Sequence, residues 1–155
     1  MTRIEHIDNP DAPKANSLVP AASAVVADND GRLLLHRRSD NKLWSIPGGA
    51  MEVGETITET VVREVREETG LNVKAERVVG IYSDPGHVVE YGDGEVRQEF
   101  SVCFACRIVG GKLQAVDESI DVGFFTPDEI ANLDMAQTIR RRIADFLKNG
   151  PVAFD

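Results

Sequence analysis

The segment from Thr56 to Gly70 constrains the fold most, because it carries both a start and a stop signal for one amphipathic helix. Thr56 and Glu59 have the spacing of a capping box, in which two residues cap the free N–H groups of the first helical turn. Gly70 stands where a left-handed residue commonly ends a helix. Apolar residues recur between these signals at helical spacing: Ile57, Val61, Val62 and Val65. The sequence therefore predicts a helix over residues 56–69 that buries one face.

This helix also carries three glutamates close to its apolar side. At about 100° per residue, Glu64, Glu67 and Glu68 fall within roughly 100° of one another on a helical wheel. Glu68 falls between Ile57 and Val61, so the carboxylates flank the buried side instead of opposing it. Like charges at this spacing repel, and partial burial increases the cost, which a divalent cation with oxygen ligands would relieve. A metal site and a solvated acidic face are both open at this point.

Strand and turn signals alternate along much of the remaining chain. Branched and aromatic runs predict strands over residues 21–27, 32–37, 73–82, 96–108 and 121–126, with Asp28–Gly31 as the turn of a hairpin between the first two. The strand over 96–108 is apolar on both faces in its second half, so we expect it to be central. Pro127 opens a short helix, and residues 136–148 form the last one. The buried stripe of that helix is predicted to be Ile139, Ile143, Phe146 and Leu147. This order predicts an α/β fold with a mixed sheet between helices.

The length of 155 residues fits one domain. Residues 1–18 contain Pro10, Pro13 and few apolar residues, which predicts a loose N-terminal arm without a stable element. We expect a single domain over residues 19–150 and a short C-terminal tail over 151–155. Residues 1–20 lack the apolar core of a secretory signal, and the longest apolar run, Ala21–Ala27, is too short to cross a bilayer. A cytoplasmic protein is the expectation.

The net charge of −9 argues against broad binding to DNA or RNA, which requires a basic surface that displaces counterions. A small phosphorylated substrate stays open, because a divalent metal can mediate between an acidic protein and an anionic ligand. We therefore expect neither a nucleic acid polymer nor a membrane as a partner.

The two cysteines, Cys103 and Cys106, lie within the strand predicted over 96–108. Residues three apart on a strand point to opposite faces and lie roughly 10 Å apart, which exceeds the reach of a disulfide. No second pair completes a zinc site. Two buried free thiols are predicted.

The segment from Gly49 to Leu71 resembles the Nudix box, G-x5-E-x7-R-E-U-x-E-E-x-G-U with U an aliphatic residue, at every specified position. The matching residues are Gly49, Glu55, Arg63, Glu64, Val65, Glu67, Glu68, Gly70 and Leu71. The approach to the box, through Arg37, Arg38 and Trp44-Ser-Ile-Pro-Gly-Gly49, is also similar to that of the family. The likeness covers roughly residues 20–147, and the box is its specific part.

The resemblance implies the Nudix fold, an α/β/α sandwich around a mixed sheet. It implies that Glu64, Glu67, Glu68 and the Gly49 carbonyl hold Mg²⁺, with Mn²⁺ as a substitute. It further implies that Arg63 orients the glutamates through charge-assisted hydrogen bonds. Glu55 would brace the junction of loop and helix. The implied reaction is attack of a metal-activated water on a phosphorus of a nucleoside diphosphate derivative. Many relatives pair, so a homodimer is also an option.

In some family members a glutamate in a loop after the box accepts the proton of the attacking water, and Glu118 is the candidate for that residue here. The general base could therefore be Glu64, Glu67 or Glu118. Glu118 precedes an aromatic strand, as such a glutamate does in the family, although a solvated loop residue is an equal alternative. Family members commonly carry Arg-Trp where this chain has Gly123-Phe124, which removes one potential substrate contact.

Three residues before the box are candidate substrate contacts. Arg37 and Arg38 suit phosphate, because a guanidinium matches phosphate oxygens; surface charge at a strand end is the alternative. Trp44 could meet a base or simply pack in the core.

Two function classes follow from these observations. The first is a pyrophosphohydrolase acting on ADP-ribose, a nucleotide sugar or a nucleoside triphosphate. The second is a Nudix-fold nucleotide sensor without catalysis. Such sensors usually lose box residues, and this chain keeps all of them, which favours the enzyme.

Overall fold

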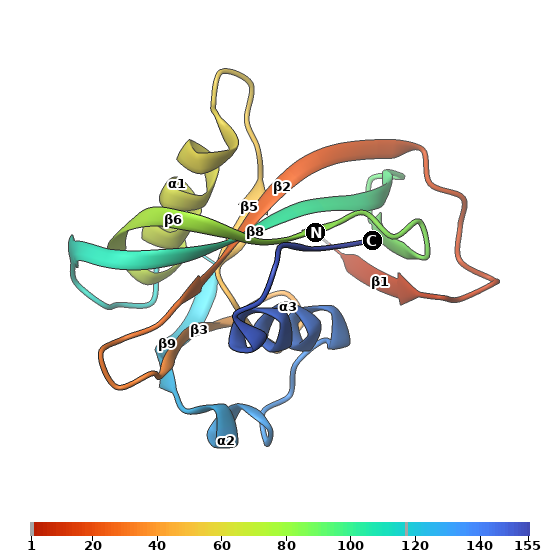
Figure 1. The fold of residues 1–155 in the computed structure, drawn as a ribbon. Coiled ribbons are helices and arrows are strands. Elements are labelled where there is room, and N and C mark those ends of the chain that lie inside the picture. Colours follow the sequence, from red (N-terminus) through yellow and green to blue (C-terminus); the bar gives the residue numbers. More distant parts are fainter. Residues whose placement is uncertain (1, 117) are drawn as a thin grey trace.

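The longest strand, β8 (Val96–Gly111), organises the main sheet in the computed structural model, which describes residues 2–116 and 118–155 (Figure 1). One edge of β8 pairs in parallel with β2 (Ser17–Val26) along the whole of β2. The other edge is shared between β7 (His87–Tyr91) near its start and β6 (Leu71–Tyr82) further along, both antiparallel. The predicted central position of this strand is confirmed.

Short strands extend this mixed seven-stranded sheet at its edges. β5 (Gly48–Ala50) pairs with β2, and β10 (Ala153–Phe154) pairs in parallel with β6. β1 (Arg3–Ile7) pairs antiparallel with β7 from Arg3↔Tyr91 to Ile7↔His87. The prediction that residues 1–18 form no stable element is therefore wrong, and the predicted tail over 151–155 contains the short strand β10. Both ends of the chain carry strands whose backbone groups are paired by distant elements, which local composition does not reveal.

Glu5 anchors β1 to the rest of the molecule. Its Oε1 lies 3.0 Å from His87 Nε2 and accepts a 3.2 Å hydrogen bond from Thr138 Oγ1, and its Oε2 lies 3.1 Å from Arg3 Nη1. Burial alone would raise the pKa of Glu5, but His87 and Arg3 outweigh it and lower that pKa to about 2.

We expect Glu5→Gln to destabilise the protein at neutral pH by up to about 3 kcal/mol, because a lowered carboxyl pKa stabilises the folded state. This stabilisation is complete above the unfolded-state pKa of 4.5 and is lost as pH falls towards about 2. Urea unfolding of parent and variant across this pH range measures the effect. The two stabilities should differ at pH 7 and converge in acid. A difference that does not change with pH would contradict the ionic role of Glu5.

A second, three-stranded sheet has the order β4-β3-β9. It comprises β4 (Trp44–Ser45), β3 (Leu33–Arg38) and β9 (Ser119–Phe125). The predicted hairpin between β2 and β3 is wrong, because only one bridge, Ala27↔Leu33, joins them before they diverge into different sheets. β2 pairs instead with β8 and β5, and β3 with β4 and β9.

Helix α1 (Ile57–Thr69) forms as its end signals predict. The Thr56 side chain accepts from the Glu59 N–H, and the Glu59 side chain accepts in return from the Thr56 N–H. Gly70 ends the helix at φ 79°, and a side chain there would collide with the backbone of Lys112. A glycine is therefore required at this position both by its conformation and by its packing.

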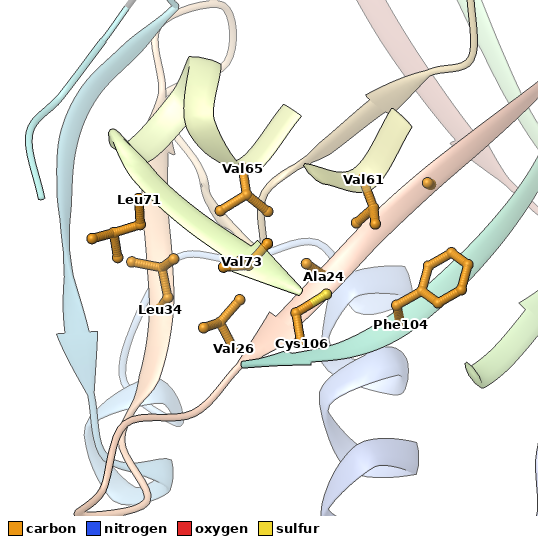
Figure 2. Packing of buried hydrophobic residues seen from close by; sticks show 10 residues of the cluster. Ala24, Val26, Leu34, Val61, Val65, Leu71, Val73, Phe104 and Cys106 are labelled. Atoms are coloured by element: carbon orange, nitrogen blue, oxygen red, sulfur yellow. The ribbon is translucent and has the colours of Figure 1, made fainter. Parts of the chain in front are cut away.

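The two faces of the main sheet are covered by different helices, which gives the predicted α/β/α sandwich (Figure 1). Val61 and Val65 of α1 pack on one face, against a cluster that includes Val26, Val73 and Phe104 (Figure 2). The other face carries α2 (Pro127–Ile130) and α3 (Gln137–Lys148). Ile139, Ile143 and Phe146 pack there as predicted.

One residue of the predicted α3 stripe is placed wrongly. Leu147 is exposed, and Arg142 is buried in its stead. The helix is turned so that a cation, rather than a leucine, faces the interior.

Both cysteines are buried free thiols, as predicted. Cys106 belongs to the apolar cluster under α1 and Cys103 to the cluster on the opposite side. Their side chains therefore lie on opposite faces of β8.

Candidate active site

Arg63, in the middle of α1, connects the preceding loop to two of the three helix glutamates. Its Nε and Nη2 donate to both oxygens of Glu55 at 2.6 and 3.0 Å, and Nη2 also donates to the Ala50 carbonyl at 3.0 Å. Its Nη1 donates to Glu64 at 2.8 Å and to Glu67 at 3.2 Å. A single guanidinium thus sets the orientation of both carboxylates relative to the loop.

Glu55 in turn holds the loop against the first turn of α1. Its Oε1 accepts from the Glu52 N–H at 2.9 Å and from the Thr60 hydroxyl at 3.1 Å. The hydrogen bond from Arg63 is the main reason that the pKa of Glu55 falls to about 2. Glu55 is therefore ionised at any physiological pH.

Glu64 and Glu68 face the sheet, whereas Glu67 is exposed. Glu68 is 8% exposed and accepts a 2.7 Å hydrogen bond from the Gly48 N–H, and its burial raises its pKa to about 8. Burial also raises the pKa of Glu64, whose carboxylate lies so close to Gly49 that a Cβ there would overlap it. The wheel prediction that carboxylates flank the buried side is correct for two of the three.

A cavity of about 620 Å³ opens beside these two carboxylates, a volume typical of small-molecule sites. Its lining includes residues from several parts of the box and its approach: Arg38, Trp44, Gly48, Gly49, Glu64, Glu68 and Glu118. Glu118 thus reaches the same cavity as the helix glutamates although 50 residues of chain separate it from Glu68. Glu67 and Gly70 do not line it; Gly70 caps the helix.

The three predicted substrate contacts are not equivalent in the structure. Arg37 is exposed outside the cavity lining and donates to the Lys42 carbonyl at 2.9 Å. Arg38 lines the cavity and pairs with Asp40 through two hydrogen bonds of 2.9 and 2.6 Å. Trp44 lines it too, while its ring packs edge-on against Phe125, with 4.8 Å between centroids. The structure brings Arg38 and Trp44, but not Arg37, to the carboxylates.

His36 lies beside Glu68 of the candidate site and was not predicted from the sequence. It is 1% exposed, its Nδ1 lies 2.7 Å from Ser119 Oγ, and its Nε2 lies 3.6 Å from Glu68 Oε2. Burial lowers the pKa of His36 to about 4, so the ring is neutral at physiological pH. Its place after the apolar run Leu33–Leu35 and before two arginines was the only available signal.

The chemistry of the donor set fits a hard divalent cation. Two glutamates with raised pKa values meet at one cavity, and a cation would relieve both their repulsion and their desolvation. As the side chains lie, no three acidic, histidine or cysteine groups in residues 2–116 and 118–155 already converge on a common point. Glu67 is exposed, is hydrogen-bonded to Arg63 and lies outside the cavity lining.

The NUDIX domain family matches residues 17–146 of the chain. A MutT-like protein from Streptomyces ambofaciens is 36% identical over 127 residues, which cover 82% of this chain and 75% of the relative. An ADP-ribose pyrophosphatase from Methanocaldococcus jannaschii is 34% identical over 135 residues, covering 81% and 72%. The crystal structure of an ADP-ribose pyrophosphatase from Streptococcus suis shares 28% identity, covers 88% of this chain and 98% of its own, and superposes with a TM-score of 0.69.

The chain therefore belongs to the Nudix family and is a Nudix hydrolase. The family is generally dependent on divalent metal ions. Within the part of the chain that the structure describes, no helix is both long and apolar enough to traverse a bilayer.

Proposed function

We propose that this protein is a Mg²⁺-dependent pyrophosphohydrolase that cleaves a nucleoside diphosphate linked to another moiety, a class that includes ADP-ribose, nucleotide sugars and nucleoside triphosphates. The observation that carries the proposal is the half-buried Glu64 beside the buried Glu68 at the wall of a cavity of about 620 Å³. The relatives named ADP-ribose pyrophosphatase support a diphosphate substrate.

In this proposal Glu64, Glu67, Glu68 and the Gly49 carbonyl hold Mg²⁺, and Mn²⁺ can replace it. When bound, the metal supplies a water of lowered pKa and neutralises charge on the diphosphate. Arg63 keeps Glu64 in place through the 2.8 Å hydrogen bond, and the Gly48 N–H does the same for Glu68 at 2.7 Å. These two hydrogen bonds fix the orientation of the Glu64 and Glu68 carboxylates.

The proton of the attacking water is accepted by Glu64, Glu67 or Glu118. Glu64 and Glu118 line the cavity from different elements, so they approach a bound diphosphate from different directions. Arg38 and Trp44 are proposed to contact the substrate, and Arg37 is not, because it lies outside the cavity lining. Neutral His36 behind Glu68 adds no positive charge that would compete with the cation.

A non-catalytic nucleotide sensor is the second class to be tested, although no feature of the site favours it. We also propose a cytoplasmic location, and a homodimer as the assembly to be examined by sedimentation analysis. Neither bears on the chemistry above.

The proposed activity predicts release of a mononucleotide from at least one member of a panel of ADP-ribose, a nucleotide sugar and a nucleoside triphosphate in the presence of Mg²⁺. Chromatographic product analysis measures it. Turnover should stop in excess EDTA and return when Mg²⁺ or Mn²⁺ is restored. Full activity in EDTA would disprove the metal mechanism, and binding without product would favour the sensor.

A further inference from the structure

Part of the cavity lining comes from elements outside the Nudix box, namely β1, β2, β7, β8 and α3. Side chains of this part of the lining include Glu5, Ser23, His87, Tyr91, Ser101 and Arg142. None of these residues belongs to the Nudix box. The box therefore does not determine the chemistry of this part of the site.

Arginines in the cavity lining are neutralised within the protein, with one exception. Three have a carboxylate partner: Arg3 with Glu5, Arg38 with Asp40 and Arg97 with Glu95. Arg142 has none, since no carboxylate among residues 2–116 and 118–155 lies within 4.0 Å of its guanidinium. It is nevertheless 5% exposed, and its Nε has no hydrogen-bond partner in the described structure.

The surroundings of Arg142 compensate its charge only in part. Its guanidinium lies 4.7 Å from the centroid of the Tyr82 ring, a cation–π contact that is weaker than an ion pair with hydrogen bonds. A buried charge without a partner is costly in a folded protein. An anion that enters the cavity from solution would supply the missing counter-charge for this guanidinium.

Two serine hydroxyls lie on the same wall. Ser23 of β2 pairs with Cys103 of β8, so Ser101, two residues earlier on β8, points to the same side of the sheet. Both serines are buried and line the cavity, and Ser23 Oγ has no hydrogen-bond partner in the described structure. The Ser23 hydroxyl and the Arg142 guanidinium, which line the same cavity, are both suited to bind phosphate oxygens.

We propose that Arg142, Ser23 and Ser101 form an anion subsite that binds a phosphate group of the substrate other than the diphosphate held at the acidic helix. The identification of the bound molecule as the nucleotide substrate rests on the proposed function. A subsite of this kind favours nucleotides that carry a further phosphate group. It disfavours ADP-ribose, whose only phosphates are those of the diphosphate that is cleaved. The subsite is proposed to contribute binding, not chemistry.

Inorganic phosphate tests the subsite without metal or turnover. In EDTA, at ionic strength balanced with chloride, phosphate should raise the melting temperature of the parent protein. Arg142→Met should abolish this rise, and Arg142→Lys should retain part of it. Arg141→Met is the matched control and should keep the full rise, because Arg141 is exposed and paired with Asp155. No response in the parent, or an equal response in Arg142→Met, would overturn the proposal.

Kinetics test the same subsite in the working enzyme. Arg142→Met should raise KM for a nucleoside triphosphate by about 10- to 100-fold with kcat nearly unchanged, and leave KM for ADP-ribose within a small factor. Ser101→Ala removes only one hydroxyl and should raise KM for the nucleoside triphosphate by a smaller factor. This variant tests the subsite if Arg142→Met does not fold. Equal effects on both substrates would overturn the proposal. Absence of any hydrolysis would contradict the proposed function. The phosphate-dependent melting temperature would then still test the subsite.

Discussion

Glu64→Gln and Glu67→Gln are each expected to lower kcat by roughly 10²–10⁴, the range for losing a general base or the charge of a metal ligand. Glutamine preserves the oxygen that accepts from Arg63, so the hydrogen bonds of 2.8 and 3.2 Å can persist while the negative charge is lost. Steady-state kinetics with saturating Mg²⁺ measure the effect. The folded state should be retained in both variants.

Glu59→Gln is the control for these variants. Glu59 is exposed on the same helix, and glutamine can replace glutamate in its capping-box role. It should therefore change kcat little. Losses of equal size at all three positions would show that negative charge on the helix, rather than specific carboxylates at the cavity, matters for turnover.

Glu68→Gln is expected to stabilise the metal-free protein and to weaken its response to metal. The folded-state pKa of Glu68 is raised to about 8 from 4.5, so the folded protein binds this proton more tightly than the unfolded chain. The associated stability is complete below pH 4.5 and is lost as pH rises through about 8. In EDTA above pH 8 the variant should exceed the parent by about 3–5 kcal/mol, because glutamine is never charged.

Added Mg²⁺ should reverse this order. A ligand that binds only the folded parent adds about 2.7 kcal/mol at 100 times its dissociation constant, and the variant should gain much less. Paired melting curves at pH 6 and 9, with EDTA or Mg²⁺, measure both effects. If the variant is no more stable than the parent in EDTA at pH 9, or gains equally from Mg²⁺, Glu68 is neither strained nor a ligand.

Features that depend on interactions between residues close in the sequence were predicted correctly. The capping box at Thr56 and Glu59 and the left-handed Gly70 act within one turn of the helix they delimit, and all three appear as predicted. The opposite orientation of Cys103 and Cys106 follows from the two-residue period of a strand. The Nudix box spans only 23 residues, so its pattern is readable without any knowledge of the tertiary structure.

Expectations failed where a long-range partner decides the outcome. Residues 3–7 form a strand through pairing with β7, and β2 and β3 diverge into different sheets, where they pair with β8 and β9. Leu147 is exposed and Arg142 is buried because the rotation of α3 is set by packing against the sheet. No feature within these segments carries that information.

The family, the α/β class, the acidic helix and the arginine that orients its glutamates could all be predicted from the sequence, because each depends on residues close together in the chain. The burial of Glu68, the position of His36 behind it and the place of Glu118 in the same cavity became visible in the folded structure. The same holds for the buried guanidinium of Arg142 in the lining of that cavity. Burial and charge compensation depend on elements distant in sequence, and these two quantities determine the chemistry of the site.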